Sequence, residues 1–122
     1  MSQYIVRDKS FSFALRIIKL SKYLNEQKKE YVLSKQLLRS GTAIGALIRE
    51  AEHGESKADF IHKMAIAQKE ANESEYWIEL LFQSNYIEEV QCQSIFKDCE
   101  EIRKMLASII LTTKKNLKSD KL

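Results

Sequence analysis

Two short patterns carry side chains that could bind a metal ion. Glu50-x-x-His53 and Asp59-x-x-His62 each place a carboxylate and an imidazole at positions i and i+3, which is a ligand spacing of di-iron helical bundles. Such a centre also needs inward carboxylates on the other helices, and the expected first helix, residues 10–25, has no acidic residue. Both patterns flank one turn. We therefore interpret these side chains as surface groups near helix ends and expect neither a metal nor a cofactor.

Other catalytic arrangements cannot be assembled from this sequence. The three glycines stand at positions 41, 45 and 54 and form no phosphate-binding loop. Both histidines belong to the same turn region, so no nucleophile gains an adjacent imidazole. Cys92 and Cys99 are about 10 Å apart along one helix, too far for a mutual disulfide, and are expected to be thiols in a reducing compartment. We expect no enzymatic activity.

Basic side chains are concentrated in the two terminal parts of the chain. Residues 1–49 contain 10 basic and 3 acidic side chains, residues 50–101 contain 4 and 13, and residues 102–122 contain 6 and 1. The first and last helices of an up-down bundle are antiparallel neighbours. We therefore expect residues near position 10 to lie beside residues near position 115, so that the two basic parts form one stripe.

This basic stripe has two interpretations. Clustered cations attract the phosphate backbone of RNA or DNA by releasing its counterions. The alternative is an ordinary solvated helix face, partly neutralised by Glu100 and Glu101. The side chains predicted to bind nucleic acid are Arg7, Lys9, Arg16, Lys19, Lys22, Arg103, Lys104, Lys114, Lys115 and Lys118.

The third helical segment carries a second apolar arc besides its core stripe. A tryptophan with isoleucine and leucine on such an arc, bordered by carboxylates, is typical of a subunit contact. The alternative is a helix that packs against two neighbours within its own bundle. The predicted interface residues are His62, Ile66, Glu73, Trp77 and Leu80.

Helical periodicity predicts the elements that position these side chains. The chain has no proline and only three glycines, which favours long uninterrupted helices. The expected helices span residues 10–25, 31–53, 57–84 and 88–117, and residues 119–122 are expected to fray. Short connections between long helices predict an all-α, antiparallel up-down-up-down four-helix bundle, with residues 1–122 as a single domain.

The ends and faces of these helices follow from local signals. Asp8 or Ser10 is the expected N-cap of the first helix, whose buried face should include Phe11 and Ile18. The third helix should open with a capping box at Ser56. The sequence lacks the apolar core of a signal peptide and a run long enough to span a membrane. We expect a cytoplasmic protein that does not contact the membrane.

The stretch from Gln36 to Tyr86 resembles the family of proteins encoded by intervening sequences in bacterial 23S rRNA genes. The matching pieces are Leu37-Leu-Arg-Ser40, Ile44-Gly-Ala46, Ile48, Glu50-Ala51, Ser56-Lys-x-Asp-Phe60, Ala65-Ile-Ala67 and the glutamate-rich stretch from Glu70 to Leu80. The chain departs from the family pattern at Ala43 and Leu47, where the family usually has Ser and Asn.

The resemblance implies a homo-oligomer, with a pentameric ring as the expected assembly. It also points to a relative, the accessory protein of diversity-generating retroelements, which implies nucleic acid and a reverse transcriptase as partners. The family motif falls on Arg39, Glu50, Lys57, Asp59 and Phe60. The implied roles are structural: packing for Phe60, capping for Asp59 and a polar contact between Arg39 and Glu50.

Two functional hypotheses follow. The first is a non-enzymatic, oligomeric helical protein that binds RNA or DNA through backbone phosphates. The second is a purely structural or protein-binding ring, whose partner docks on the acidic face of the third and fourth helices.

Overall fold

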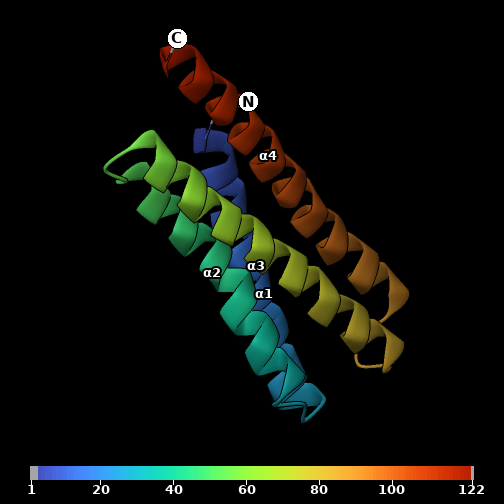
Figure 1. Cartoon of the computed structure of the whole chain (residues 1–122). Helices are drawn as coiled ribbons and strands as arrows, with labels where there is room; N and C mark the ends of the chain where they lie inside the picture. The colour runs from blue at the N-terminus through green and yellow to red at the C-terminus, as the bar shows by residue number, and fades with distance from the viewer. Residues whose placement is uncertain (1–2, 122) are drawn as a thin grey trace.

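A computed structural model describes residues 3–121 as an all-α structure. Its helices are α1 (Gln3–Gln27), α2 (Leu33–Glu52), α3 (Lys57–Gln83) and α4 (Glu89–Lys121). Helices α1 and α2, α2 and α3, α3 and α4, and α1 and α4 pack against each other, whereas α1 and α3 lie on a diagonal. Figure 1 shows the helices alternating in direction. The predicted antiparallel four-helix bundle is confirmed.

Helix α1 begins earlier than the sequence indicated. Its first residue is Gln3, so Asp8 and Ser10 lie inside the helix and the N-cap expectation is wrong. The Ser10 side chain is fully buried and its hydroxyl donates to the Arg7 carbonyl at 2.9 Å. Val6 extends the buried stripe one turn further. Because no proline or glycine interrupts these residues, the helix continues through the two capping candidates.

A glutamate from the preceding turn caps the start of α2. The Glu30 carboxylate accepts the backbone N–H groups of Val32, Leu33 and Ser34 at 3.1, 3.0 and 2.8 Å. Burial alone would raise the pKa of this carboxyl, but the three backbone donors outweigh it and hold the pKa below its ordinary value. These bonds place the first helical residue at Leu33, two residues after the expected start.

The predicted start of α3 is confirmed, whereas the predicted end of α4 is wrong. The Ser56 hydroxyl accepts the Asp59 N–H at 3.0 Å, so the predicted cap of α3 is confirmed. Helix α4 continues to Lys121, although we expected it to end at Leu117 and the chain to fray after it. Of that expected tail, Leu122 lies outside the described residues. None of the described helices is long and apolar enough to cross a membrane.

The core runs along the full length of the bundle, and α1 contributes a narrower face to it than its sequence predicted. Phe13, Ile17 and Leu24 are buried. Phe11 and Ile18 are 52% and 38% exposed, so the expectation that they face the core is wrong. The apolar arc of α1 is wider than the strip that α2 and α4 cover, which leaves part of it at the surface.

Two glycines in α2 allow α1 to approach closely. A Cβ atom at Gly41 would lie 2.9 Å from Cγ1 of Ile17, and one at Gly45 would lie 3.3 Å from Oγ of Ser10. The contact at Gly41 is with a branched, fully buried side chain that has no room to move. The glycine at 41 therefore sets how near the two helices lie and how α1 is rotated.

We expect Gly41→Ala to destabilise the protein by about 1 kcal/mol. Overpacking against Ile17 costs about 1–3 kcal/mol, and the better helix propensity of alanine offsets about 1 kcal/mol of it. Gly45→Ala is the matched control, because the small Ser10 side chain can shift, and it should leave stability unchanged or slightly raised. Urea unfolding followed by circular dichroism measures both. Equal stability of the two variants would contradict this account of the α1–α2 contact.

Candidate nucleic-acid interface

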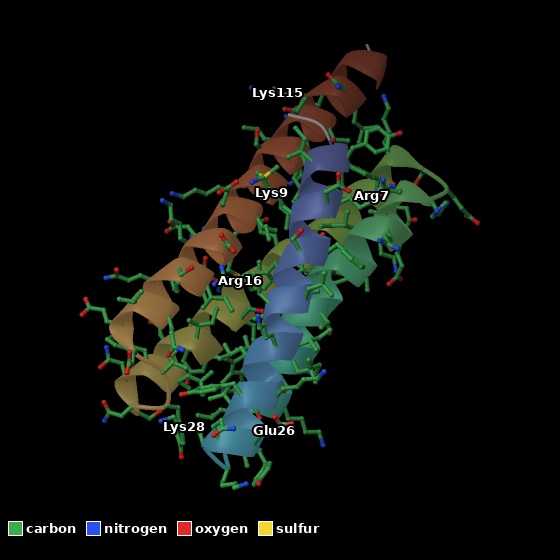
Figure 2. All side chains as sticks on the ribbon, turned by 180° about the vertical axis from the view of Figure 1, so that it is seen from behind. Arg7, Lys9, Arg16, Glu26, Lys28 and Lys115 are labelled. Atoms are coloured by element: carbon green, nitrogen blue, oxygen red, sulfur yellow. The ribbon has the colours of Figure 1, made fainter. Side chains whose placement is uncertain are left out.

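Ion pairs join the basic side chains of α1 to acidic side chains of α4. Lys9 Nζ lies 2.5 Å from Glu101 Oε1. Arg16 forms an ion pair with Asp98 and also donates to the Ser94 hydroxyl at 3.0 Å. Figure 2 shows Lys9 and Arg16 on the side of α1 that faces α4. The middle of the predicted stripe is therefore neutralised from within the bundle.

The register of α1 against α4 differs from the expected one. Lys9 lies beside Glu101, not beside residues near position 115. The reason is helix length, since α4 has 33 residues and α1 has 25. The last turns of α4 extend past the beginning of α1, as Figure 1 shows. The last turns of α4, which carry Lys114, Lys115 and Lys118, therefore do not pack against α1.

Three further cations of the predicted set are also paired. Arg103 Nε donates to both carboxylate oxygens of Glu75, at 3.1 and 2.9 Å, and this hydrogen bonding raises the pKa of the guanidinium. Lys104 lies 3.8 Å from Glu100, and Arg7 lies 3.4 Å from Glu52. Because a carboxylate already faces each of these cations, they have less charge to offer to a phosphate.

Five predicted cations remain available to a ligand. All are exposed, and none forms an ion pair with another residue that the structure describes. They fall into two groups, one in the second half of α1 and one in the last turns of α4. Figure 2 shows how far apart these regions are, since Lys28, in the turn after α1, and Lys115 lie at opposite ends of the bundle. These cations are Lys19, Lys22, Lys114, Lys115 and Lys118.

The boundary between α1 and α4 is hollowed on either side of the Arg16–Asp98 pair. One cavity of about 410 Å³ is lined by Leu20, Tyr23 and Ile95, with Arg16 at its edge. A second cavity, of about 280 Å³, lies between Lys9 and Glu101. The ion pairs therefore join α1 to α4 across a boundary where the two helices pack loosely.

The predicted subunit interface on α3 is partly engaged within the protein. His62 is exposed, and Ile66, Glu73, Trp77 and Leu80 are half-buried. The Trp77 indole N–H donates to Glu73 at 3.0 Å, and Trp77 packs against the core. Helix α3 thus uses part of this arc to pack within its own bundle, as the alternative interpretation held.

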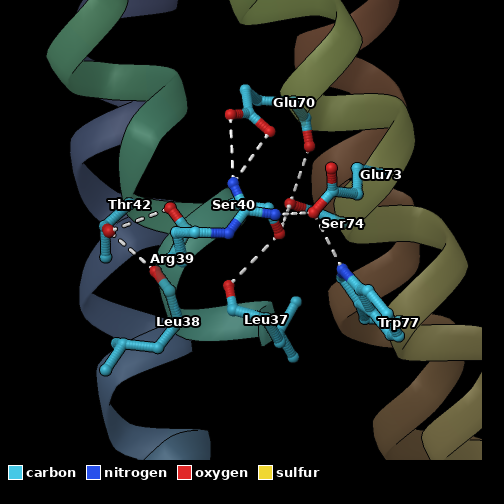
Figure 3. Close-up of polar contacts among 9 residues, drawn as sticks. All are labelled: Leu37, Leu38, Arg39, Ser40, Thr42, Glu70, Glu73, Ser74 and Trp77. Carbon is cyan, nitrogen blue, oxygen red and sulfur yellow. Dashed lines mark hydrogen bonds and ion pairs between the residues drawn. The ribbon is translucent and has the colours of Figure 1, made fainter. Parts of the chain in front are cut away.

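Figure 3 shows how the arc is tied to α2. Arg39 forms ion pairs with Glu73 and, at 3.3 Å, with Glu70. Beneath them the hydroxyl oxygens of Ser40 and Ser74 lie 2.9 Å apart in the core. This polar ladder aligns α2 with α3, since each buried hydroxyl needs its partner in place.

Three of the family-motif residues, Arg39, Glu50 and Phe60, contribute to the packing of α2 and α3. The expected contact between Arg39 and Glu50 is absent, because Arg39 pairs with α3 and Glu50 pairs with Lys63 at 3.2 Å. Residues 39 and 50 are separated by about 16 Å of helical rise, which prevents their contact. Phe60 packs against the core as expected. Lys57 is exposed at the first position of α3.

Apart from His62, the remaining residues singled out from the sequence lie outside the basic stripe and the α3 arc. Ala43 and Leu47 are half-buried on α2, and Leu47 packs against the core. His53 and His62 are exposed on either side of the α2–α3 turn. No group of three or more metal-ligating side chains occurs within residues 3–121.

No sequence pattern singles out Arg49, which lies over the Phe11 ring. Its guanidinium carbon is 5.3 Å from the ring centroid. No local pattern links two residues so far apart in the chain. Helical periodicity predicts Phe11 to be buried, which leaves no reason to expect a surface contact with Arg49.

We expect Glu75→Gln to lower the free energy of unfolding by about 2 kcal/mol. The variant removes the carboxylate that accepts two hydrogen bonds from the half-buried Arg103 and leaves it only Glu100, at 3.9 Å; losing one partner of a sequestered pair is costly. Glu101→Gln, which removes the exposed partner of Lys9, is the matched control and should change nothing measurable. Thermal and urea unfolding test both variants. If the two substitutions cost the same, the Glu75–Arg103 pair has no special part in joining α3 to α4.

Comparisons with known proteins agree with this architecture. A profile of the protein family described as "23S rRNA-intervening sequence protein" matches residues 2–108. The crystal structure of a protein of unknown function from the S23 ribosomal protein family of Bacteroides thetaiotaomicron is 57% identical in sequence, with a TM-score of 0.89. The match covers 90% of this chain and 98% of that chain. None of the curated proteins matches the chain.

Proposed function

The chain belongs to the family of 23S rRNA-intervening sequence proteins, and from this premise we propose that it is a non-enzymatic, self-associating protein that binds the backbone of RNA or DNA. The observation that carries the proposal is the group of exposed lysines at the far end of α4. Lys114, Lys115 and Lys118 have no ion pair with any described residue. Elsewhere along α1 and α4 most cations face a carboxylate.

The spacing of these lysines favours an anionic partner. Lys114 and Lys118 are one helical turn apart, where like charges repel and weaken a helix by a few tenths of a kcal/mol. Lys115 adds a third charge beside them. A phosphate backbone laid along this end of α4 would relieve the repulsion and release its own counterions. Lys19 and Lys22 offer a second, separate group on α1.

We expect the triple variant Lys114→Ala/Lys115→Ala/Lys118→Ala to bind a short structured RNA more weakly and with less dependence on salt. Each lost phosphate contact should reduce the slope of log K against log salt concentration by about 1. Fluorescence anisotropy over a series of salt concentrations measures both quantities.

Lys104→Ala is the matched control for this experiment. Lys104 lies on the same helix and is exposed, but it faces Glu100 at 3.8 Å. Its removal should therefore leave the salt slope unchanged. A triple variant that binds RNA as the original protein does would refute the assignment of this lysine group. No binding by the original protein at low salt would refute the nucleic-acid function as a whole.

A second candidate function is a ring that holds a protein partner and binds no nucleic acid. The observation that favours it is the outer face of α3, where Tyr76 is 56% exposed beside Trp77, with their ring centroids 5.1 Å apart. The chain segment around them, residues 50–101, carries most of the acidic side chains. An apolar face bordered by carboxylates suits a subunit contact or a basic protein surface.

We expect Leu80→Arg to dissociate the assembly, because it places a charge on the outer arc of α3. Light scattering gives the mass in solution, and circular dichroism verifies that the helices are retained. Leu111→Arg is the control, since Leu111 is a leucine that is 57% exposed on α4, outside the proposed contact. An unchanged mass for Leu80→Arg would remove this arc from the subunit interface.

A further inference from the structure

One arginine differs from the other arginines that the structure describes. Arg7, Arg16, Arg39 and Arg103 each form an ion pair with a carboxylate. Arg49 forms none with a described residue. It lies instead over the Phe11 ring, across the boundary between α2 and α1. Its guanidinium keeps its charge and its hydrogen-bond donors for a ligand.

The ring beneath Arg49 is itself open to solvent. Phe11 is 52% exposed, although a phenylalanine is among the residues most often buried. A second ring follows the same pattern, since Tyr4 is 58% exposed and the Arg7 guanidinium carbon lies 5.4 Å from its centroid. The outer face of α1 therefore presents two aromatic rings, each paired with a guanidinium group.

Three of these groups, Arg7, Phe11 and Arg49, border a hollow between the first half of α1 and the end of α2. The hollow has a volume of about 610 Å³ and is lined by Arg7, Phe11, Arg49 and His53, together with Asp8 and Ser12. Arg7 also contacts Glu52 at 3.4 Å, so Arg49 is the cation here that is most available to an anion. Figure 2 shows Arg7 on the α2 side of α1, away from Lys9 and Arg16.

We infer that this hollow binds an unpaired nucleotide of a single-stranded nucleic acid, with its base on Phe11 and its phosphate on Arg49. The inference rests on the proposed nucleic-acid function and names the form of nucleic acid that it takes. Aromatic rings hold unpaired bases of any sequence by stacking, and guanidinium groups bind the phosphates between them. Base pairs in a duplex cannot offer a free face to the ring.

The spacing of the two rings fits a stacked strand. Tyr4 and Phe11 lie two turns apart on one face of α1, about 10 Å along the helix axis. This is about three times the 3.4 Å rise of a stacked base, so two bases three steps apart in one strand can reach the two rings. Arg7 lies over the Tyr4 ring and Arg49 over the Phe11 ring, so each ring has a guanidinium group beside it.

A second copy of the chain is the other occupant that this face could take, because Leu15 and Ile18 are exposed on the same side of α1. A second copy would have to place one of its own carboxylates on Arg49 to cover this face, since an unpaired buried guanidinium is strongly unfavourable. A nucleotide supplies both a ring for Phe11 and an anion for Arg49. The charge of the face therefore favours the nucleic acid.

The test compares a labelled oligouridylate of about twelve nucleotides with a duplex of the same length, each binding to the full-length protein. Phe11→Ala should weaken binding of the single strand about tenfold, as expected for the loss of one stacked base, and should change duplex binding less than about twofold. Arg49→Ala should act in the same direction. Arg49→Lys should restore only part of the affinity, because lysine keeps the charge without the planar group.

Tyr31→Ala is the matched control, since Tyr31 is an equally exposed ring in the turn between α1 and α2, with no guanidinium of the described residues over it. It should leave binding of both probes unchanged. Phe11 and Arg49 are surface residues, so both variants should keep their helices, as circular dichroism will verify.

Three outcomes would overturn the inference. If Phe11→Ala and the original protein bind the single strand equally while the lysine variants lose duplex binding, the stacking site fails and the proposed function stands. If light scattering shows a smaller assembly for Phe11→Ala, while each protomer keeps its affinity for the single strand, a second copy occupies the face. If the original protein binds neither probe at low salt, the proposed function fails and the stacking site fails with it.

Discussion

The close approach of α1 to α2 is the constraint on which the surface of this protein depends. Gly41 leaves room for Ile17 and nothing larger than a hydrogen at its own position. Once Ile17 is seated there, the rotation of α1 about its axis is determined. The same rotation turns Lys9 and Arg16 toward α4 and leaves Phe11 facing solvent. One packing contact therefore decides which side chains of α1 a ligand can reach.

Half of the predicted basic stripe is paired with carboxylates inside the bundle. The basic α1 and the acidic start of α4 lie side by side, and their ion pairs bridge a boundary that is otherwise hollow. Pairs of this exposure add little stability, but they remove cations from the surface. A count of lysine and arginine along α1 and α4 thus overstates the charge that a phosphate backbone would meet.

The two proposed contacts lie on different faces of the bundle. The proposed nucleotide site uses α1 and α2, and the proposed subunit contact uses the outer side of α3, which lies diagonally across the bundle from α1. The ion pairs of Arg39 with Glu70 and Glu73 already join α2 to α3. Glu73 in turn accepts the Trp77 indole N–H, which holds that ring in place. Assembly through α3 would leave the rings of α1 open, so an oligomer could present several copies of the same site and gain affinity through multivalency.

The sequence alone determined the fold class, the number of long helices within residues 3–121, the Ser56 cap and most of the core, because these depend on local periodicity and on short-range hydrogen bonds. It did not determine where α1 begins, how α1 lies against α4, or that Phe11 faces solvent beside Arg49. Those features depend on how far each helix extends and on one glycine contact between helices. Pairings between distant residues leave no periodic signal in a single sequence, so only the packed bundle could reveal them.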